Sequence, residues 1–191
     1  MKTTLTRILI ATLAVLMLLT AAACRKNPNL DPGYILNQSN TETPENEITA
    51  FLAGNEGSVE ALAKSMIKSD GFLAYNYSYR MVDYDKGTME FYVQKQEKTD
   101  GVWSACEDKD AMRLVKVKFV GTVTYNPTLS ESVVVFAPRM AVSDKTLSLV
   151  YCTDESGKAA VEAGKYHPGY TVTLMQIEGN WYCAEAVKSG Q

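Results

Sequence analysis

The chain has 191 residues with a formal net charge of −3, and hydrophobic residues make up 46% of it. This length and apolar content suit one domain with a buried core. The mildly acidic charge argues against nucleic acid as a partner, because phosphate binding needs clustered Lys and Arg, and against electrostatic docking on anionic lipid.

The first 23 residues are typical of a secretory signal peptide. Lys2 and Arg7 make the start positive, and residues 8–19 form a run that is apolar apart from Thr12. That run is shorter than the roughly 20 residues that span a bilayer, and small residues follow it. We expect residues 1–23 to be removed, which leaves a net charge near −5 because they hold two bases and no acid.

The end of this segment, Ala21-Ala22-Ala23-Cys24, resembles the lipobox of bacterial lipoproteins. In that family the cysteine thiol carries a diacylglycerol and becomes the mature N-terminus, so the resemblance implies lipid attachment at Cys24. Ala21 departs from the pattern, which prefers Leu there. Ala21 and Ala23 also fit an ordinary cleavage site. We expect lipidation, because an unmodified thiol at the mature N-terminus is exposed to oxidation.

Residues 24–43 are rich in Asn, Pro, Thr and Ser and hold few apolar side chains. Such a composition cannot bury a core, so we expect a disordered tether. Residues 44–191 are then a single globular, strand-rich domain. The implied localisation is exported and lipid-anchored, at the cell membrane or cell surface.

Two short amphipathic helices are expected at the start of this domain. Thr43 and Pro44 are typical of an N-cap and a first helical position, and Gly54 is expected to end the first helix. Ser58 can cap the second helix, which ends at Gly71. Each helix has one apolar stripe that needs a surface to pack on.

Alternating apolar and polar residues predict strands after Gly71. Residues 73–81 and 89–94 flank a glycine-containing turn and indicate a β-hairpin. Further strands are expected at residues 111–125, 131–142, 146–152, 169–177 and 180–187. Gly121 is expected to form a bulge or bend. Strands do not alternate with helices, so a parallel sheet is not expected.

This pattern predicts a mainly β fold, α+β at the margin, in the form of an antiparallel β-sandwich-like domain preceded by two short helices. The alternative is one curved sheet around the helices, whose order of elements resembles the NTF2-like cone. In that alternative the tyrosine face of the first strand lines a pocket.

Aromatic side chains are the candidate ligand contacts. Tyr75, Tyr77 and Tyr79 share one face of the first strand, and a ring with a polar tip suits a peptide or a carbohydrate. The other interpretation, which we favour, is that this face packs under the helices. Trp103 and Trp181 are further candidates, with packing in the core or at its rim as the favoured alternative.

The four cysteines are Cys24, Cys106, Cys152 and Cys183. Export favours a disulfide. Cys152 and Cys183 lie in apolar, strand-like runs, so we predict that they pair, with Cys106 bonded to either of them as the alternative. If Cys24 carries lipid, one of the other three is left unpaired.

Neither a cofactor nor a metal site is expected. His167 is the only histidine, and we expect it to be exposed in a loop; a zinc site needs several His or Cys ligands. The run Asp83-x-Asp85-x-Gly87 resembles the start of a calcium loop, but a hairpin turn explains it better.

Three hypotheses for function remain. The first is a non-catalytic binding or interaction module of the cell envelope, attached to the membrane by its lipid, whose partner is an envelope protein, a peptide or a glycan. The second is an envelope structural or assembly factor. The third is a hydrolase that uses the acidic cluster Glu107, Asp108 and Asp110, which needs facing carboxylates in a shaped cleft. We expect that cluster to be a solvated loop and the protein not to be an enzyme.

Overall fold

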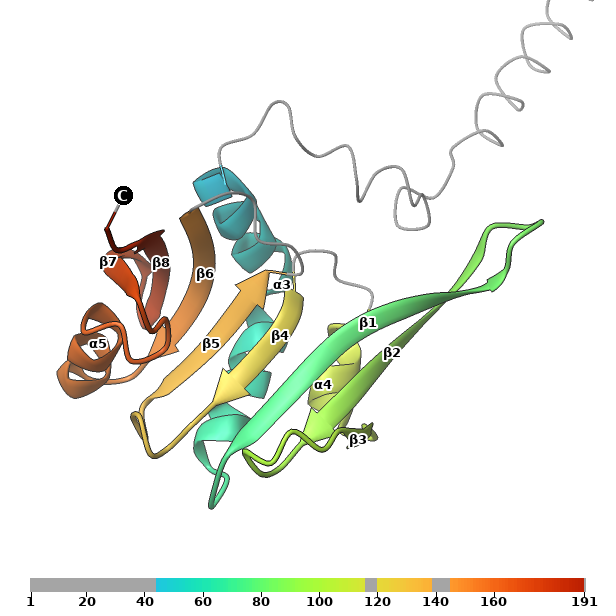
Figure 1. The fold of residues 1–191 in the computed structure, drawn as a ribbon, viewed down its shortest axis with the longest axis horizontal. Helices are drawn as coiled ribbons and strands as arrows, with labels where there is room; N and C mark the ends of the chain where they lie inside the picture. Colours follow the sequence, from blue (N-terminus) through green and yellow to red (C-terminus); the bar gives the residue numbers. More distant parts are fainter. Residues whose placement is uncertain (1–43, 116–119, 139–144, 191) are drawn as a thin grey trace, which may run out of the picture. The chain divides into compact units, whose positions relative to one another are not determined.

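The computed structural model describes residues 44–115, 120–138 and 145–190, which belong to one compact unit of the chain, Thr41–Gln191. Its elements, in chain order, are α3 (Pro44–Ile67), β1 (Leu73–Asp83), β2 (Thr88–Gln96), β3 (Ser104–Ala105), α4 (Lys109–Arg113), β4 (Val120–Tyr125), β5 (Val133–Pro138), β6 (Lys145–Cys152), α5 (Glu155–Glu162), β7 (Tyr170–Glu178) and β8 (Trp181–Lys188). The eight strands of this part form one antiparallel sheet in the order β3-β2-β1-β4-β5-β6-β8-β7 (Figure 1).

The predicted mainly antiparallel β fold is confirmed, but the two-sheet sandwich is wrong. All of the strands described belong to a single sheet. The apolar face of a sheet must be buried against another layer, and here the helix α3 supplies that layer instead of a second sheet. In having one sheet with a helix packed against it, the structure agrees with the alternative architecture.

The prediction of two N-terminal helices is also wrong, because α3 runs without a break from Pro44 to Ile67. Gly54 lies inside it, as does Gly57, and each costs the helix about 1 kcal/mol relative to Ala. Burial of one aliphatic side chain contributes about 1.5–3 kcal/mol. The helix buries six large apolar side chains, namely Ile48, Phe51, Leu52, Val59, Leu62 and Met66. Packing on the sheet therefore outweighs the two glycines.

The sheet separates two apolar clusters, one on each face. The larger cluster joins α3 and α4 to alternate residues of the strands, among them Phe136, Leu149 and Trp181. The smaller cluster lies on the other face and includes Val161 of α5 and Val150. Because side chains alternate along a strand, β6 contributes neighbouring residues to both clusters.

Two of the predictions that concern single strands and turns are confirmed, unlike the prediction of a two-sheet sandwich. The hairpin is confirmed, with Met81 opposite Met89, and so is the bulge at Gly121, since the register between β4 and β5 shifts between Val120 and Thr122. Residues 109–113 form the helix α4 rather than the start of a strand, because Asp108 caps a helix there. Residues 116–119 and 139–142 of the predicted strands lie outside the described residues.

Candidate functional site: the β1–β2 hairpin

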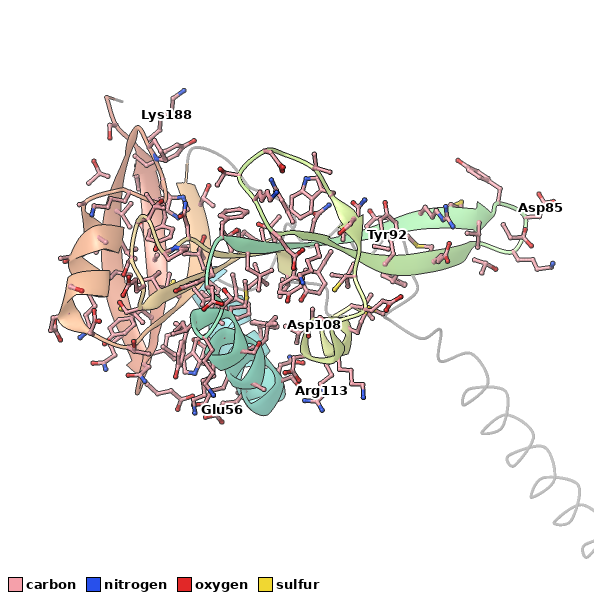
Figure 2. All side chains as sticks on the ribbon, turned by 90° about the horizontal axis from the view of Figure 1, so that it is seen from below. Glu56, Asp85, Tyr92, Asp108, Arg113 and Lys188 are labelled. Carbon is pink, nitrogen blue, oxygen red and sulfur yellow. The ribbon has the colours of Figure 1, made fainter. Side chains whose placement is uncertain are left out.

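The hairpin of β1 and β2 extends beyond its neighbours in the sheet. β4 pairs with β1 only from Leu73 to Asn76, and β3 pairs with β2 only at Gln94 and Lys95. Among the residues that the structure describes, no other strand accompanies the outer part of the hairpin. Figures 1 and 2 show this part as a two-stranded ribbon that projects from the sheet, with Asp85 at its tip.

The tip is a defined turn. The Asp83 carboxylate accepts a hydrogen bond from the Lys86 backbone N–H at 3.1 Å and pairs with the Lys86 ammonium at 2.9 Å. These hydrogen bonds with Lys86 lower the pKa of Asp83. Gly87 has a φ of 61°, in the region that favours glycine. The interpretation of this run as a hairpin turn is confirmed.

The two faces of the projecting ribbon differ in polarity. One face carries Tyr79, Met81, Met89 and Phe91, which we call the hairpin surface; the Tyr79 and Phe91 ring centroids are 6.0 Å apart, and Met81 is opposite Met89. Met81 is 39% exposed. On the other face the Arg80 guanidinium bonds to the Glu90 carboxylate at 2.6 Å.

The hairpin surface continues a row of tyrosines along β1, and this row is buried at the inner end of the hairpin. Tyr75 and Tyr77 are 1% and 2% exposed and belong to the core, whereas Tyr79 is 37% exposed. Tyr75 and Tyr77 are therefore not contacts for an external ligand, in agreement with the packing alternative. The row changes from buried to exposed because α3 and α4 cover only its inner part. In Figure 2 the tip of the hairpin at Asp85 lies well beyond Glu56 of α3 and beyond Asp108 and Arg113 at α4.

The two buried tyrosines differ in their hydroxyl groups. The Tyr75 hydroxyl donates a hydrogen bond to the Asp108 carboxylate at 2.8 Å, and burial, followed by this hydrogen bond, raises the pKa of Tyr75. The Tyr77 hydroxyl is buried and has no hydrogen-bond partner within the described ranges.

We expect Tyr75→Phe to lower the free energy of unfolding by about 1.5–3 kcal/mol, because it removes a hydrogen bond to a charged group. Tyr77→Phe is the matched control, and we expect it to be neutral or slightly stabilising, because it removes a buried hydroxyl without a partner. Urea denaturation followed by circular dichroism measures both. Equal losses in the two variants would contradict this assignment.

The two tryptophans occupy different environments. Trp181 is 3% exposed, and its ring lies 4.8 Å from that of Tyr151 and 5.7 Å from that of Phe136, centroid to centroid. Trp181 belongs to the core, as the favoured alternative predicted, and its assignment as a candidate ligand contact is wrong. Trp103 is 36% exposed in the segment between β2 and β3.

The acidic cluster has structural roles. One Asp108 oxygen accepts the backbone N–H of Asp110 at 2.9 Å and that of Ala111 at 3.3 Å, which caps α4. The other oxygen accepts the Tyr75 hydroxyl. Asp110 pairs with Arg113 at 2.9 Å, and Glu107 is exposed. Two of the three carboxylates are thus engaged in holding α4, so the geometry offers the hydrolase hypothesis no support.

The predicted disulfide between Cys152 and Cys183 is wrong. Among the described residues, none of Cys106, Cys152 and Cys183 forms a disulfide bond. Cys183 of β8 is opposite Leu149 of β6, and Cys152 is three residues further along β6. Opposed residues share a face and successive residues alternate, so Cys152 and Cys183 lie on opposite faces, in different apolar clusters. Cys24 lies outside the described residues.

His167 is half-buried, and the expectation of an exposed loop histidine is corrected. Its Nε2 atom is buried without a hydrogen-bond partner among the residues described, and its ring meets that of Tyr170 edge-on at 6.5 Å. Burial lowers the pKa of the imidazole from its ordinary value of 6.5.

The stability of the protein should therefore fall as the pH drops below about 6.5, because the unfolded chain binds a proton at His167 there and the folded chain resists it. His167→Gln should remove this part of the pH dependence while leaving the part due to carboxyl groups. Urea denaturation of both chains between about pH 8 and 5, the range in which histidine titrates, measures the effect. An identical pH dependence in both chains would rule it out.

Two further features bear on function. The described ranges contain no group of three or more His, Cys, Asp or Glu side chains placed to hold a metal ion. Within the same ranges, none of the helices combines the length and the apolar character needed to cross a membrane.

Comparisons with protein-family models, with curated proteins and with solved structures find no match to this chain.

Proposed function

We propose that the protein is an exported, lipid-anchored interaction module of the cell envelope, and that the hairpin surface is where it binds a protein or peptide partner. The observation that carries the second part is the row of aromatic and methionine side chains that continues past the cover of α3 and α4. Export and anchoring rest on the N-terminal pattern of Lys2, Arg7 and Cys24.

The chemistry of the hairpin surface suits a protein partner. Methionine is flexible and adapts to an irregular apolar surface, and tyrosine adds a polar tip to an apolar ring. The tip of the ribbon carries Asp83 and Asp85, and charged groups are costly inside a bilayer. The hairpin is thus better suited to contact with another polypeptide than to insertion in lipid.

The hairpin surface is tested by crosslinking in living cells of the source organism. A photoreactive residue at Met81, on the apolar face, should give a crosslinked adduct of one defined mass. The same residue at Arg80 is the matched control, because it is the next position of β1 and faces the opposite way. An adduct at Arg80 but not at Met81, adducts of equal yield at both, or none at either would contradict the proposal.

The anchor is tested separately by the intact mass of the protein from the membrane fraction. Lipidation predicts the mass of residues 24–191 plus a diacylglycerol-type adduct. In the Cys24→Ser variant, this form should be absent and the protein should leave the membrane fraction. An unmodified mature chain in the soluble fraction would overturn the anchor but would leave the assignment of the hairpin surface intact.

A further inference from the structure

The two edges of the sheet differ in their protection. An edge strand presents unpaired backbone N–H and C=O groups to any other strand, and proteins block such edges with charged residues, Pro, bulges or cover. On one side β2 carries Glu90 and Lys95, and β3 pairs with part of it. On the other side β7 is the last strand, and within residues 44–115, 120–138 and 145–190 it pairs only with β8.

β7 lacks these protections over most of its length. Residues 170–177 contain neither a charged residue nor Pro. The register with β8 is regular from Tyr170 to Gln176, and the bulge comes only between Gln176 and Glu178. This regular run exceeds the usual strand length of about 5–6 residues. It is long enough to accept a complete strand.

We infer that β7 pairs with β7 of a second copy of this chain, antiparallel and with the two-fold axis at Thr173. This register sets Thr173 opposite itself and pairs Val172 with Leu174, Thr171 with Met175, and Tyr170 with Gln176, each twice. Opposed residues share a face, so the Val172–Leu174 pairs extend the apolar cluster beside α5. Such cross-strand apolar and Thr–Thr pairs stabilise a sheet.

The distribution of charge favours a second copy as the occupant. The chain is acidic overall, with a net charge of −3. Because the run 170–177 of β7 is uncharged, two copies can approach along it without bringing like charges together. The charge nearest the two-fold axis is on β8, where Glu185 is opposite Thr173; Lys188 is opposite Tyr170, and Glu178 ends β7 itself. The two Glu185 residues would be three strand spacings, about 14 Å, apart, beyond the Debye length of about 8 Å at physiological salt.

The symmetry of this contact makes it self-limiting. Each copy uses the β7 edge against the same edge of the other, which closes the assembly as a dimer rather than a filament. The opposite edges of the joined sheet are then the ones protected by β3 and by the charges of β2.

The test is sedimentation velocity of residues 24–191 carrying Cys24→Ser, over a range of concentrations. We expect a dimer. Thr173→Lys and Thr173→Glu each set like charges opposite one another at the axis, and each should raise the dissociation constant at least about tenfold, or 1.4 kcal/mol. An equimolar mixture of the two variants sets opposite charges there and should restore the dimer. Thr99→Lys, in the exposed segment before β3, is the matched control and should leave it unchanged.

Three results would overturn the inference. One is a monomer at every concentration. Another is a dimer that neither Thr173 variant weakens while circular dichroism shows both to be folded. The third is a monomer for residues 24–191 but a dimer for residues 41–191, since the N-terminal segment of the chain would then be the strand that covers β7.

Discussion

Replacement of Trp181 by Ala is expected to lower the free energy of unfolding by about 3–5 kcal/mol. Trp181 is buried in the larger cluster between Phe136 and Tyr151. Its removal forfeits the burial of the ring and leaves a cavity that the surrounding side chains fill only in part. The loss is a large fraction of the roughly 5–15 kcal/mol that separates the folded from the unfolded state of a typical domain.

Trp103→Ala is the matched control for this substitution, because Trp103 is 36% exposed. We expect it to cost less than about 1 kcal/mol. Guanidinium denaturation followed by circular dichroism compares the two variants. If Trp181→Ala does not fold, Trp181→Phe, which keeps an apolar ring, should fold with a smaller loss. Equal effects at the two tryptophans would contradict their placement.

Gly157→Ala is expected to lower the free energy of unfolding by about 2–3 kcal/mol, although Ala normally stabilises a helix relative to Gly by about 1 kcal/mol. Gly157 lies in the first turn of α5 and is buried against β5 and β6. An added Cβ would meet Ser132 Oγ, and it would be 2.7 Å from both Cys152 Sγ and Val133 Cγ2. Its backbone N–H also donates to the capping Asp154 carboxylate at 2.8 Å, so α5 cannot shift away without loss of its cap.

Gly54→Ala is the matched control, because an added Cβ there has nothing within 4 Å. This variant should raise the free energy of unfolding by up to about 1 kcal/mol, as expected for helix propensity alone. Thermal unfolding of both variants should therefore show shifts of opposite sign. Stabilisation by Gly157→Ala would show that the contact between α5 and the sheet is looser than described.

The candidate site was only partly predictable. The alternation of residues 73–81 correctly places Tyr75, Tyr77 and Tyr79 on one face of β1, because strand periodicity is a local property. The extent to which α3 and α4 cover that face is not a local property, because it depends on tertiary packing. This extent separates the buried Tyr75 and Tyr77 from the exposed hairpin surface. Met89 and Phe91 join that surface through cross-strand pairing with Met81 and Tyr79, a signal that the hairpin pattern already contained.

The cysteines show the same limit. Both Cys152 and Cys183 lie in strands, as their apolar neighbours predict. Their pairing was wrong because the face that each thiol occupies depends on the register between β6 and β8. A register that differed by one residue would move every side chain of a strand to the other face.

By itself the sequence determined the features that depend on near neighbours. These are the signal-peptide and lipobox-like pattern at residues 1–24, the hairpin and its turn, the bulge at Gly121 and the antiparallel character of the sheet. Only the tertiary structure decided that the strands form one sheet, that α3 is unbroken through Gly54, and which aromatic side chains are buried. The reason is physical: periodicity and turn chemistry act over a few residues, whereas burial and register depend on which distant segments pack together.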